Sequence, residues 1–360
     1  MLSKNLGYLG IFILLLASLF SCMSSTREKY RFSTGNFSKE LSLSGQPIAP
    51  GHLKMPMGLC VFAERDLLLI IDVQDNMLVK AYRLRDNKFI KSFIIKGAGP
   101  NEQLDCHKIQ YSGDLKFVYA IDQVKQKIFS YSTEDILAPG KAVFPVGDVV
   151  LSDHQLYNAA ILPNGNIVDY SNHREGKKQK VFSFYNREGN LLFNIGDFPK
   201  TGTTYRPKEL TDAFLGWFTA SRDGRHIVLC YLNTDFLDLY DANGMLIKRA
   251  QGPEYFDPGV KTVTHFKGTM VVPNAKAYHA YSSARVNNGK VYALYEGKDV
   301  LEEGGYHKKL LFSFDENLRP QTLFHLSQPI FAFDIDWGSN TLYGLTHHQD
   351  NNYLIKIKLP

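Results

Sequence analysis

The stretch Phe218-Thr-Ala-Ser-Arg-Asp-Gly-Arg-His-Ile-Val-Leu229 places a tight polar turn, Asp223-Gly224, between two short runs of strand-forming residues. Asp-Gly and Asn-Gly pairs tolerate positive φ, so they fit hairpin turns whose twist matches the flanking strands. Similar turns recur about 48 to 65 residues apart, within or a little above the spacing of propeller blades. The six turn pairs are Arg65-Asp66, Gly113-Asp114, Asn164-Gly165, Asp223-Gly224, Asn288-Gly289 and Gly338-Ser339.

A second polar turn follows each of the first five turns, as in Tyr185-Asn-Arg-Glu-Gly189 and Tyr240-Asp-Ala-Asn-Gly244. Each unit therefore reads strand, turn, strand, loop, strand, turn, strand. This order is the four-stranded blade of a β-propeller. The sequence predicts an all-β fold, a six-bladed β-propeller.

The sixth unit ends after three strands, because the chain stops at Pro360. A spare strand pattern, Phe37 to Leu43, lies near the other terminus. We predict that this N-terminal strand completes the last blade and closes the ring, which hides the edges that an open array would expose. The alternative is an open solenoid.

The composition fits one large folded domain. With 44% hydrophobic and 13% aromatic residues, the chain is too apolar for disorder. The repeat assigns residues 37–360 to a single propeller, although length alone would suggest two domains. No long segment has helical periodicity, and Pro207 to Phe214 is expected to form a turn or two of helix. The net charge is +5 without a long basic run, so no nucleic-acid partner is expected.

The N-terminus predicts export and lipid anchoring. Lys4 precedes an apolar run of about a dozen residues, Leu9 to Phe20, which is too short to span a bilayer and suits a signal peptide. The run ends in Leu19-Phe20-Ser21-Cys22, which resembles the lipobox of bacterial lipoproteins, although Phe20 departs from the usual small residue. This resemblance implies a signal peptide over residues 1–21, lipid attachment at Cys22, a tether over residues 22–36, and an outer-membrane location facing the periplasm. Ordinary secretory cleavage is the alternative.

Three further cysteines, Cys60, Cys106 and Cys230, cannot form a complete set of disulfides. One bridge between Cys60 and Cys106 is conceivable in an oxidising envelope. Burial of all three as apolar side chains is the other interpretation.

The blade pattern resembles the TolB-like six-bladed propeller lipoproteins of bacteria. Ser221-Arg-Asp-Gly-Arg-His-Ile227 is close to the Ser-Pro-Asp-Gly turn of TolB-type blades, with Arg222 in place of the proline. Lys96-Gly-Ala-Gly-Pro-Asn-Glu102 resembles the Gly-rich link that these proteins place between blades. The resemblance implies a fold and a location, and it implies no reaction, because fold alone does not select a function.

The sequence holds no strong catalytic or metal motif. Gly97 to Glu102 lacks the third glycine and the following helix of a dinucleotide loop, so we expect a tight crossing between blades, with glycines in unusual φ/ψ and Glu102 capping amides. His347-His348-Gln-Asp350 is the densest set of possible ligands, and we expect it in a solvated loop, because neighbours on a strand point to opposite faces. We therefore predict no metal and no cofactor.

The expected binding surface is the mouth of the central channel, where loops enter the inner strands. The residues near the start of these strands are Met57, His107, Asn158, Trp217, Tyr281 and Phe333. Two long connections, Lys200 to Phe214 and Pro253 to His279, are expected to shape the same face. The candidate ligand-binding residues are Tyr205, Arg206, Trp217, Tyr255, His279, His107 and Asn158. The opposing interpretation is that the ring positions only pack the channel.

This ring is aromatic and polar and lacks paired carboxylates for acid–base chemistry, so no catalytic residue is assigned. We expect a lipid-anchored, non-catalytic envelope propeller that binds or scaffolds a protein, peptide or glycan. The alternative is a hydrolase or lyase at the channel mouth, for which only His107 and Asn158 fit. A purely structural envelope component is the third possibility.

Overall fold

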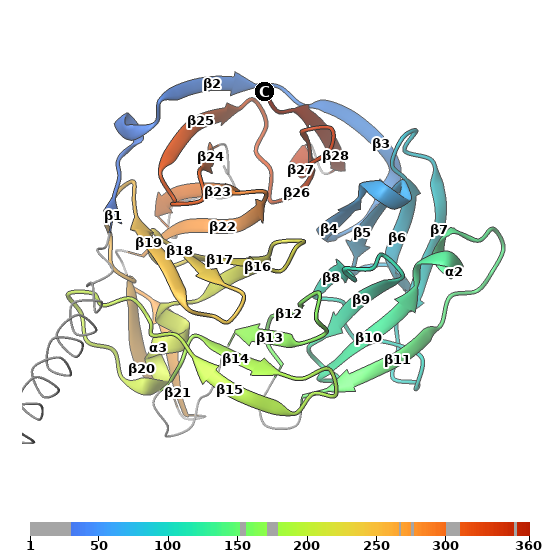
Figure 1. The fold of residues 1–360 in the computed structure, drawn as a ribbon, viewed down its shortest axis with the longest axis horizontal. Coiled ribbons are helices and arrows are strands. Elements are labelled where there is room, and N and C mark those ends of the chain that lie inside the picture. The colour runs from blue at the N-terminus through green and yellow to red at the C-terminus, as the bar shows by residue number, and fades with distance from the viewer. Residues whose placement is uncertain are drawn as a thin grey trace, which may run out of the picture.

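A computed structural model describes residues 30–151, 156–170, 179–265, 268–274, 277–299, 310–348 and 351–360. Its sheets are arranged as six blades around a central axis (Figure 1). The prediction of an all-β six-bladed propeller is confirmed. Blade one contains β4 (Pro56–Phe62), β5 (Leu67–Asp72), β6 (Met77–Arg83) and β7 (Phe89–Ile95); blade two contains β8 (Lys108–Tyr111), β9 (Phe117–Asp122), β10 (Lys127–Ser132) and β11 (Pro145–Val150); blade three contains β12 (Ala159–Ile161), β13 (Ile167–Tyr170), β14 (Phe182–Tyr185) and β15 (Leu191–Ile195).

The second half of the ring follows the same order from the axis outward. Blade four contains β16 (Gly216–Ala220), β17 (His226–Tyr231), β18 (Phe236–Asp241) and β19 (Leu246–Gln251); blade five contains β22 (Tyr278–Asn287), β23 (Lys290–Asp299), β24 (Leu310–Phe314) and β25 (Pro320–Leu326); blade six contains β26 (Ala332–Asp336), β27 (Thr341–His348), β28 (Asn351–Lys358) and β3 (Gln46–Leu53). All six predicted turn pairs lie between the first and second strands of their blades. Asp66, Gly165, Gly224 and Gly289 adopt the positive φ that these turns require.

An N-terminal strand does close the ring, but the predicted segment was wrong. Phe37 to Leu43 contains β2 (Lys39–Leu43), which pairs in parallel with β25 on the outside of blade five. The fourth strand of blade six is β3, which pairs antiparallel with β28. Aromatic packing explains why the predicted segment lies on blade five, because the ring centroids of Phe37 and Phe312 are 4.9 Å apart.

The segment before β3 forms a belt around the propeller, defined as residues 30–43. It begins with β1 (Tyr30–Arg31), which pairs in parallel with β19 of blade four, and continues through the short helix η1 (Thr34–Asn36) to β2. Figure 1 shows this blue ribbon running along the circumference from blade four to blade five, after which the chain continues into β3 of blade six. The last residues of the predicted tether, Tyr30 to Asn36, therefore lie on the propeller itself.

Helices are few and short. The expected helical turn after Pro207 is α3 (Pro207–Ala213), and α2 (Thr133–Leu137), with the 3₁₀ turn η2 (Ala63–Arg65), was not anticipated. Ser132 caps α2 by accepting a hydrogen bond from the Asp135 amide, which gives this short segment its start. Over the described ranges, no helix is long and apolar enough to cross a membrane. Cys22 and the rest of residues 1–29 lie outside the described residues.

The core lies between neighbouring blades, where Val, Leu, Ile and aromatic side chains interdigitate. Cys60 and Cys106 belong to the cluster between blades one and two, and Cys230 lies in the cluster between blades four and five. All three are buried free thiols, so the disulfide is absent and their interpretation as apolar side chains is confirmed. Burial raises the pKa of the Cys60 thiol well above its ordinary value.

Candidate ligand-binding face

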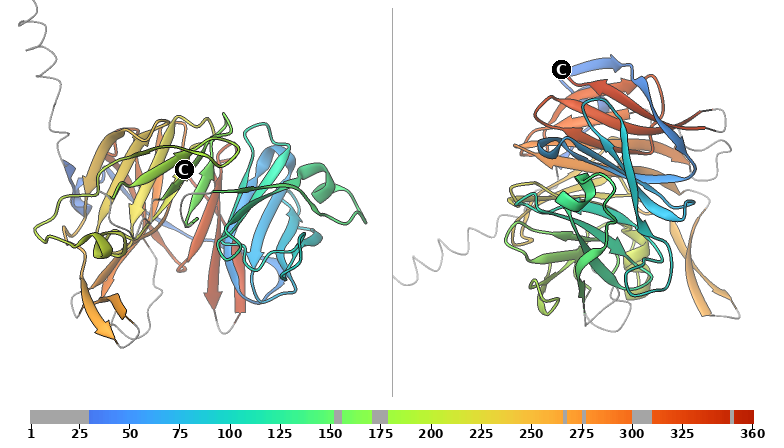
Figure 2. Two further views of the ribbon diagram at one scale, coloured as in Figure 1. Left: turned by 90° about the horizontal axis from the view of Figure 1, so that it is seen from below. Right: turned by 90° about the vertical axis from the view of Figure 1, so that its right-hand side faces the viewer.

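The inner strands all begin on one face of the ring, which we call the entry face. The pairing of Ala332 at the start of β26 with Leu345 near the end of β27 places the end of β27 on this face. An extra hairpin, β20 (Val260–His265) and β21 (Gly268–Pro273), projects on the same side (Figure 2). The first residues of the inner strands are Pro56, Lys108, Ala159, Gly216, Tyr278 and Ala332.

Buried aspartates fix the chain as it enters three of the inner strands. Asp72 accepts hydrogen bonds from the Lys54 and Met55 amides at 3.0 and 2.8 Å. Asp122 accepts the Leu104 amide at 2.7 Å, and Asp169 accepts the Asn158 amide at 2.7 Å. Sequence reasoning missed this role, although an aspartate at or next to the end of the second strand recurs in blades one, two and three. These carboxylates hold the loops of the entry face in place.

His107 and Trp217 meet at the channel mouth. Their ring centroids are 5.5 Å apart, although they come from blades two and four. The His107 amide donates to the Ile121 carbonyl oxygen, which fixes the residue just before β8. Burial, together with the neighbouring charge of Lys108, lowers the pKa of His107 to about 4. The imidazole is therefore neutral at pH 7 and offers an uncharged, partly aromatic surface.

Asn158 is joined to the same region by Lys108, a residue that sequence reasoning did not select. Lys108 Nζ donates to Asn158 Oδ1 and to the Phe218 carbonyl oxygen, both at 3.1 Å. The ammonium also lies 4.5 Å from the centroid of the Phe218 ring. Burial first, and then the charge of Arg285, lowers the pKa of Lys108 to about 7. The Lys108 amine therefore joins blades two, three and four, and its pKa lies near neutral pH.

Deeper along the axis, polar side chains tie inner strands together. Arg285 Nε donates to Asp334 Oδ1 at 2.9 Å, and Asp334 Oδ2 accepts the Val61 amide at 2.8 Å. Of the predicted ring positions, Asn158, Tyr281 and Phe333 are buried, the latter two in apolar clusters between blades, whereas Met57 is exposed. Burial therefore removes three positions from the accessible surface, and the candidate surface contracts to the side of the mouth where the partly exposed His107 and Trp217 meet.

The two long connections pack against each other and form a wall beside blade four. The Tyr205 hydroxyl donates to the Pro258 carbonyl oxygen at 2.7 Å, and the Gly202 amide donates to Asp257 Oδ2 at 2.8 Å. Thr262 of β20 donates to Glu209 of α3. Figure 1 shows α3 lying against β20, in line with these contacts.

Arg206 and Tyr255 present their side chains on the outside of this wall. The exposed guanidinium of Arg206 pairs with Glu209 at 2.6 Å at the start of α3. Hydrogen bonds from Arg206 and Thr262 lower the pKa of Glu209 to about 2. Tyr255 is 41% exposed, and its ring lies 5.4 Å from the guanidinium carbon of Arg31 in the belt. Tyr255 thus contacts the belt.

His279 is partly buried near the start of β22, where its backbone pairs with Lys298 of β23. The structure therefore divides the candidate residues into groups. His107 and Trp217 meet at the channel mouth, and Asn158 is buried and hydrogen-bonded to Lys108. Tyr205 and Arg206 belong to the wall, and Tyr255 lies beside the belt.

The two motifs set aside as unreactive have structural explanations. Glu102 Oε2 accepts the Gly99 amide at 2.7 Å, as expected for a crossing between blades. A β-carbon at Gly97 or Gly99 would displace the Glu102 carboxylate, and neither glycine has a positive φ, which corrects the expected reason. His347 and His348 end β27, so the expected loop was wrong for them, because they pair with Asn352 and Asn351. Within the described ranges, no group of three His, Cys, Asp or Glu side chains could hold a metal ion.

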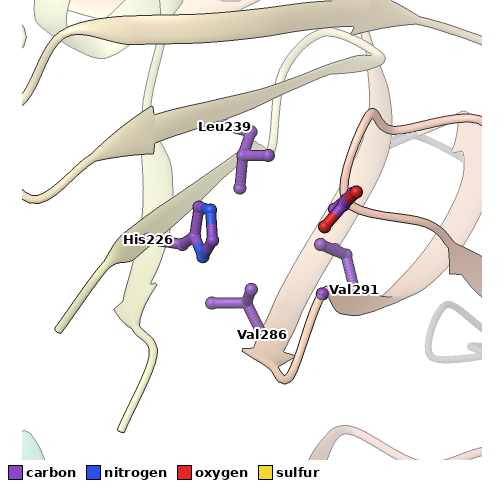
Figure 3. A pocket seen from close by; sticks show the side chains of 6 residues that line it. His226, Leu239, Val286 and Val291 are labelled. Atoms are coloured by element: carbon purple, nitrogen blue, oxygen red, sulfur yellow. The ribbon is translucent and has the colours of Figure 1, made fainter. Parts of the chain in front are cut away.

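A shallow depression lies on the opposite face, between blades four and five (Figure 3). The space between its lining side chains is about 150 Å³ even with open solvent included, which is below the roughly 300 Å³ at which small-molecule pockets begin. His226 and Glu316 border an otherwise apolar lining of Leu239, Val286 and Val291. The depression is therefore a gap between blade ends and does not compete with the entry face as a site.

Comparisons with known proteins agree with this architecture. A candidate exported protein from Bacteroides fragilis NCTC 9343 superposes with a TM-score of 0.58 at 12% identity, covering 91% of this chain and 98% of that one. A member of the DUF4221 family from Bacteroides vulgatus ATCC 8482 gives 0.59 at 12% identity, covering 89% and 97%. No curated protein matches the sequence. The family described as TolB-like 6-blade propeller-like matches residues 36–337. The chain therefore belongs to the TolB-like six-bladed propeller family.

Proposed function

We propose that this protein is a lipid-anchored propeller of the cell envelope that binds a protein, peptide or glycan at its entry face without catalysis. The observation that carries the proposal is the channel mouth, where His107 and Trp217 stand 5.5 Å apart beside a wall built from two insertions. Long connections that pack into ordered structure are often functional. Aromatic rings at a rigid rim suit recognition of extended polar ligands.

The location rests on the N-terminal pattern that ends in Cys22. A similar propeller from Bacteroides fragilis is described as a candidate exported protein, which supports an extracytoplasmic site. Lipid attachment at Cys22 would hold the propeller at the outer membrane on its periplasmic side. Two or more acyl chains are needed for a stable anchor of this kind.

The two tryptophans of the chain provide a matched test. Trp217 lies at the entry face, whereas Trp337 follows the end of β26 on the opposite face, where its ring centroid lies 5.8 Å from that of Tyr292. We expect Trp217→Ala to reduce recovery of envelope partners after crosslinking in cells by about tenfold, which corresponds to about 1.4 kcal/mol. Trp337→Ala should leave recovery unchanged. Thermal unfolding of both variants separates loss of binding from loss of folding, and equal recovery with either variant would contradict the proposal.

One observation favours the enzyme alternative. An amine with a pKa near 7, such as that of Lys108, is suited to general base catalysis at neutral pH. A panel of nitrophenyl esters and glycosides tests it. Turnover that rises through pH 7 and disappears in Lys108→Met would establish a hydrolase, and an absence of turnover across the panel would favour the binding role.

A further inference from the structure

The outermost strand of each blade has an edge that could pair with another chain, and this molecule covers two of these edges itself. β1 pairs in parallel with β19 of blade four, and β2 pairs in parallel with β25 of blade five. Both covering strands come from the belt. The chain thus shows that the circumference of this propeller accepts an added parallel strand.

Three other edges carry features that discourage pairing. β3 contains Pro47 and Pro50, which lack the amide donor. On β7, Lys91 Nζ donates to the carbonyl oxygens of Asp135 and Ala138, at 2.9 and 2.6 Å, so the segment around α2 lies over this strand. β11 begins with Pro145 and carries Asp148, which pairs with Lys127 at 2.6 Å. Prolines, charges and covering segments are the usual means of protecting sheet edges.

β15 of blade three lacks these protections. Its sequence is Leu-Leu-Phe-Asn-Ile, without charge or proline, and it ends its sheet with no further strand among the described residues. Leu192 is 49% exposed and Phe193 is 42% exposed. The Phe193 ring stacks on Phe184 of β14 with centroids 4.9 Å apart. An added strand could extend this stack outward by one side chain.

We propose that the free edge of β15 binds an extended segment of a partner protein as a fifth, parallel strand of blade three. The position is continuous with the belt, because β1 occupies the same place on the neighbouring blade. Main-chain hydrogen bonds would provide most of the affinity, as in other cases of strand addition. An aliphatic or aromatic side chain opposite Phe193 would provide selectivity, and the uncharged strand requires no complementary charge. This site is separate from the entry face and does not depend on its function.

The test uses the full chain and a fluorescent peptide that carries residues 37–43, the segment already seen as an added parallel strand. We expect saturable binding by fluorescence polarisation, weakened at least tenfold by Phe193→Lys. Val146→Lys on β11 is the matched control, since Val146 is 56% exposed on an edge that Pro145 and Asp148 already protect, and it should change binding less than twofold. Absence of binding, or equal binding by both variants, overturns the proposal.

A photo-crosslinking residue at position 192, compared with one at position 146, identifies the occupant in cells. The proposal expects adducts at 192 whose crosslinked peptide is an extended segment of another protein. If the adducts join two copies of this chain, and light scattering shows an oligomer that Phe193→Lys dissociates, the occupant is a second copy and the assignment to a different protein is wrong. Adducts from both positions in equal yield also overturn it. Loss of binding in Trp217→Ala with adducts at 192 retained would show that the two sites are independent.

Discussion

Blades three and four each contain four antiparallel strands of their own. They differ in whether a further strand covers the outermost one. In blade four, Asp238 of β18 stands opposite Arg249 of β19, buried as a doubly hydrogen-bonded ion pair at 2.7 and 2.6 Å. In blade three, the corresponding residues are Ser183 and Asn194, which share a neutral hydrogen bond of 2.6 Å. Blade four is sealed by β1, and blade three is open. The charged pair is enclosed by the Tyr231 and Tyr240 hydroxyls and by the Asp197 carbonyl oxygen of the neighbouring blade, so blade four buries a charged pair at the position where blade three has a neutral one.

Of the substitutions that test this comparison, removal of the Phe32 side chain, which anchors the belt, should cause the largest loss of stability. Phe32 is fully buried, and its ring lies 5.3 Å from Phe314 and 5.9 Å from Phe37. Phe32→Ala should lower the free energy of unfolding by about 3–5 kcal/mol, because a large aromatic side chain leaves a cavity. Urea unfolding measures this loss. Leu41→Ala, on the exposed side of the belt, should change it by less than about 0.5 kcal/mol.

Equal effects of these two substitutions would show that the belt is held by its backbone pairing and that its aromatic side chains contribute little. Hydrogen exchange distinguishes the outcomes further. In Phe32→Ala, the amides of β19 should lose protection before those of β15, because only the former are covered by the belt.

The charged pair of blade four provides the next test. Asp238 accepts hydrogen bonds from the Tyr231 and Tyr240 hydroxyls, both at 2.8 Å, as well as from Arg249. Asp238→Asn should cost about 3 kcal/mol, since it leaves the guanidinium buried without its counter-ion. Ser183→Ala in blade three should cost only about 1 kcal/mol, because it removes one neutral hydrogen bond. Equal costs would show that the charge of the buried pair adds nothing beyond a neutral hydrogen bond.

The repeat could be predicted from sequence because it depends on local chemistry. Turn pairs such as Asp223-Gly224 need only their own φ and the strands beside them. The identity of the closing strand could not be predicted in this way. Pro47 and Pro50 make the sequence of β3 resemble a loop. Phe37 to Leu43 has a strand pattern, but Phe37 packs on Phe312 of blade five, a contact between residues far apart in the sequence.

The candidate site shows the same limit. His107, Asn158 and Trp217 were predictable as residues near the starts of inner strands, and the structure brings them together at one side of the mouth. Lys108 was missed because its importance comes from the Phe218 carbonyl oxygen, which lies in another blade. Tyr255 was grouped with the mouth, yet its ring contacts Arg31 of the belt, a segment that had no predicted place on the propeller.

The smallest expected effect concerns pH and the half of the ring that the belt does not reach. There, His107 and Lys108 join blade two to blades three and four at the axis. The folded-state pKa of His107 is about 4, below the ordinary 6.5, so between these values the unfolded chain binds more protons. Stability should therefore fall as the pH decreases from 6.5 to 4, by at most about 1.4 kcal/mol at pH 5.5 for this group. His107→Asn should remove this part of the slope in urea titrations at pH 4 to 7, while Phe32→Ala, in the belted half, should lower the curve without changing its shape. A His107→Asn curve parallel to that of the unmodified protein would mean that the imidazole is solvated at the mouth and that the axis contributes nothing pH-dependent in this range.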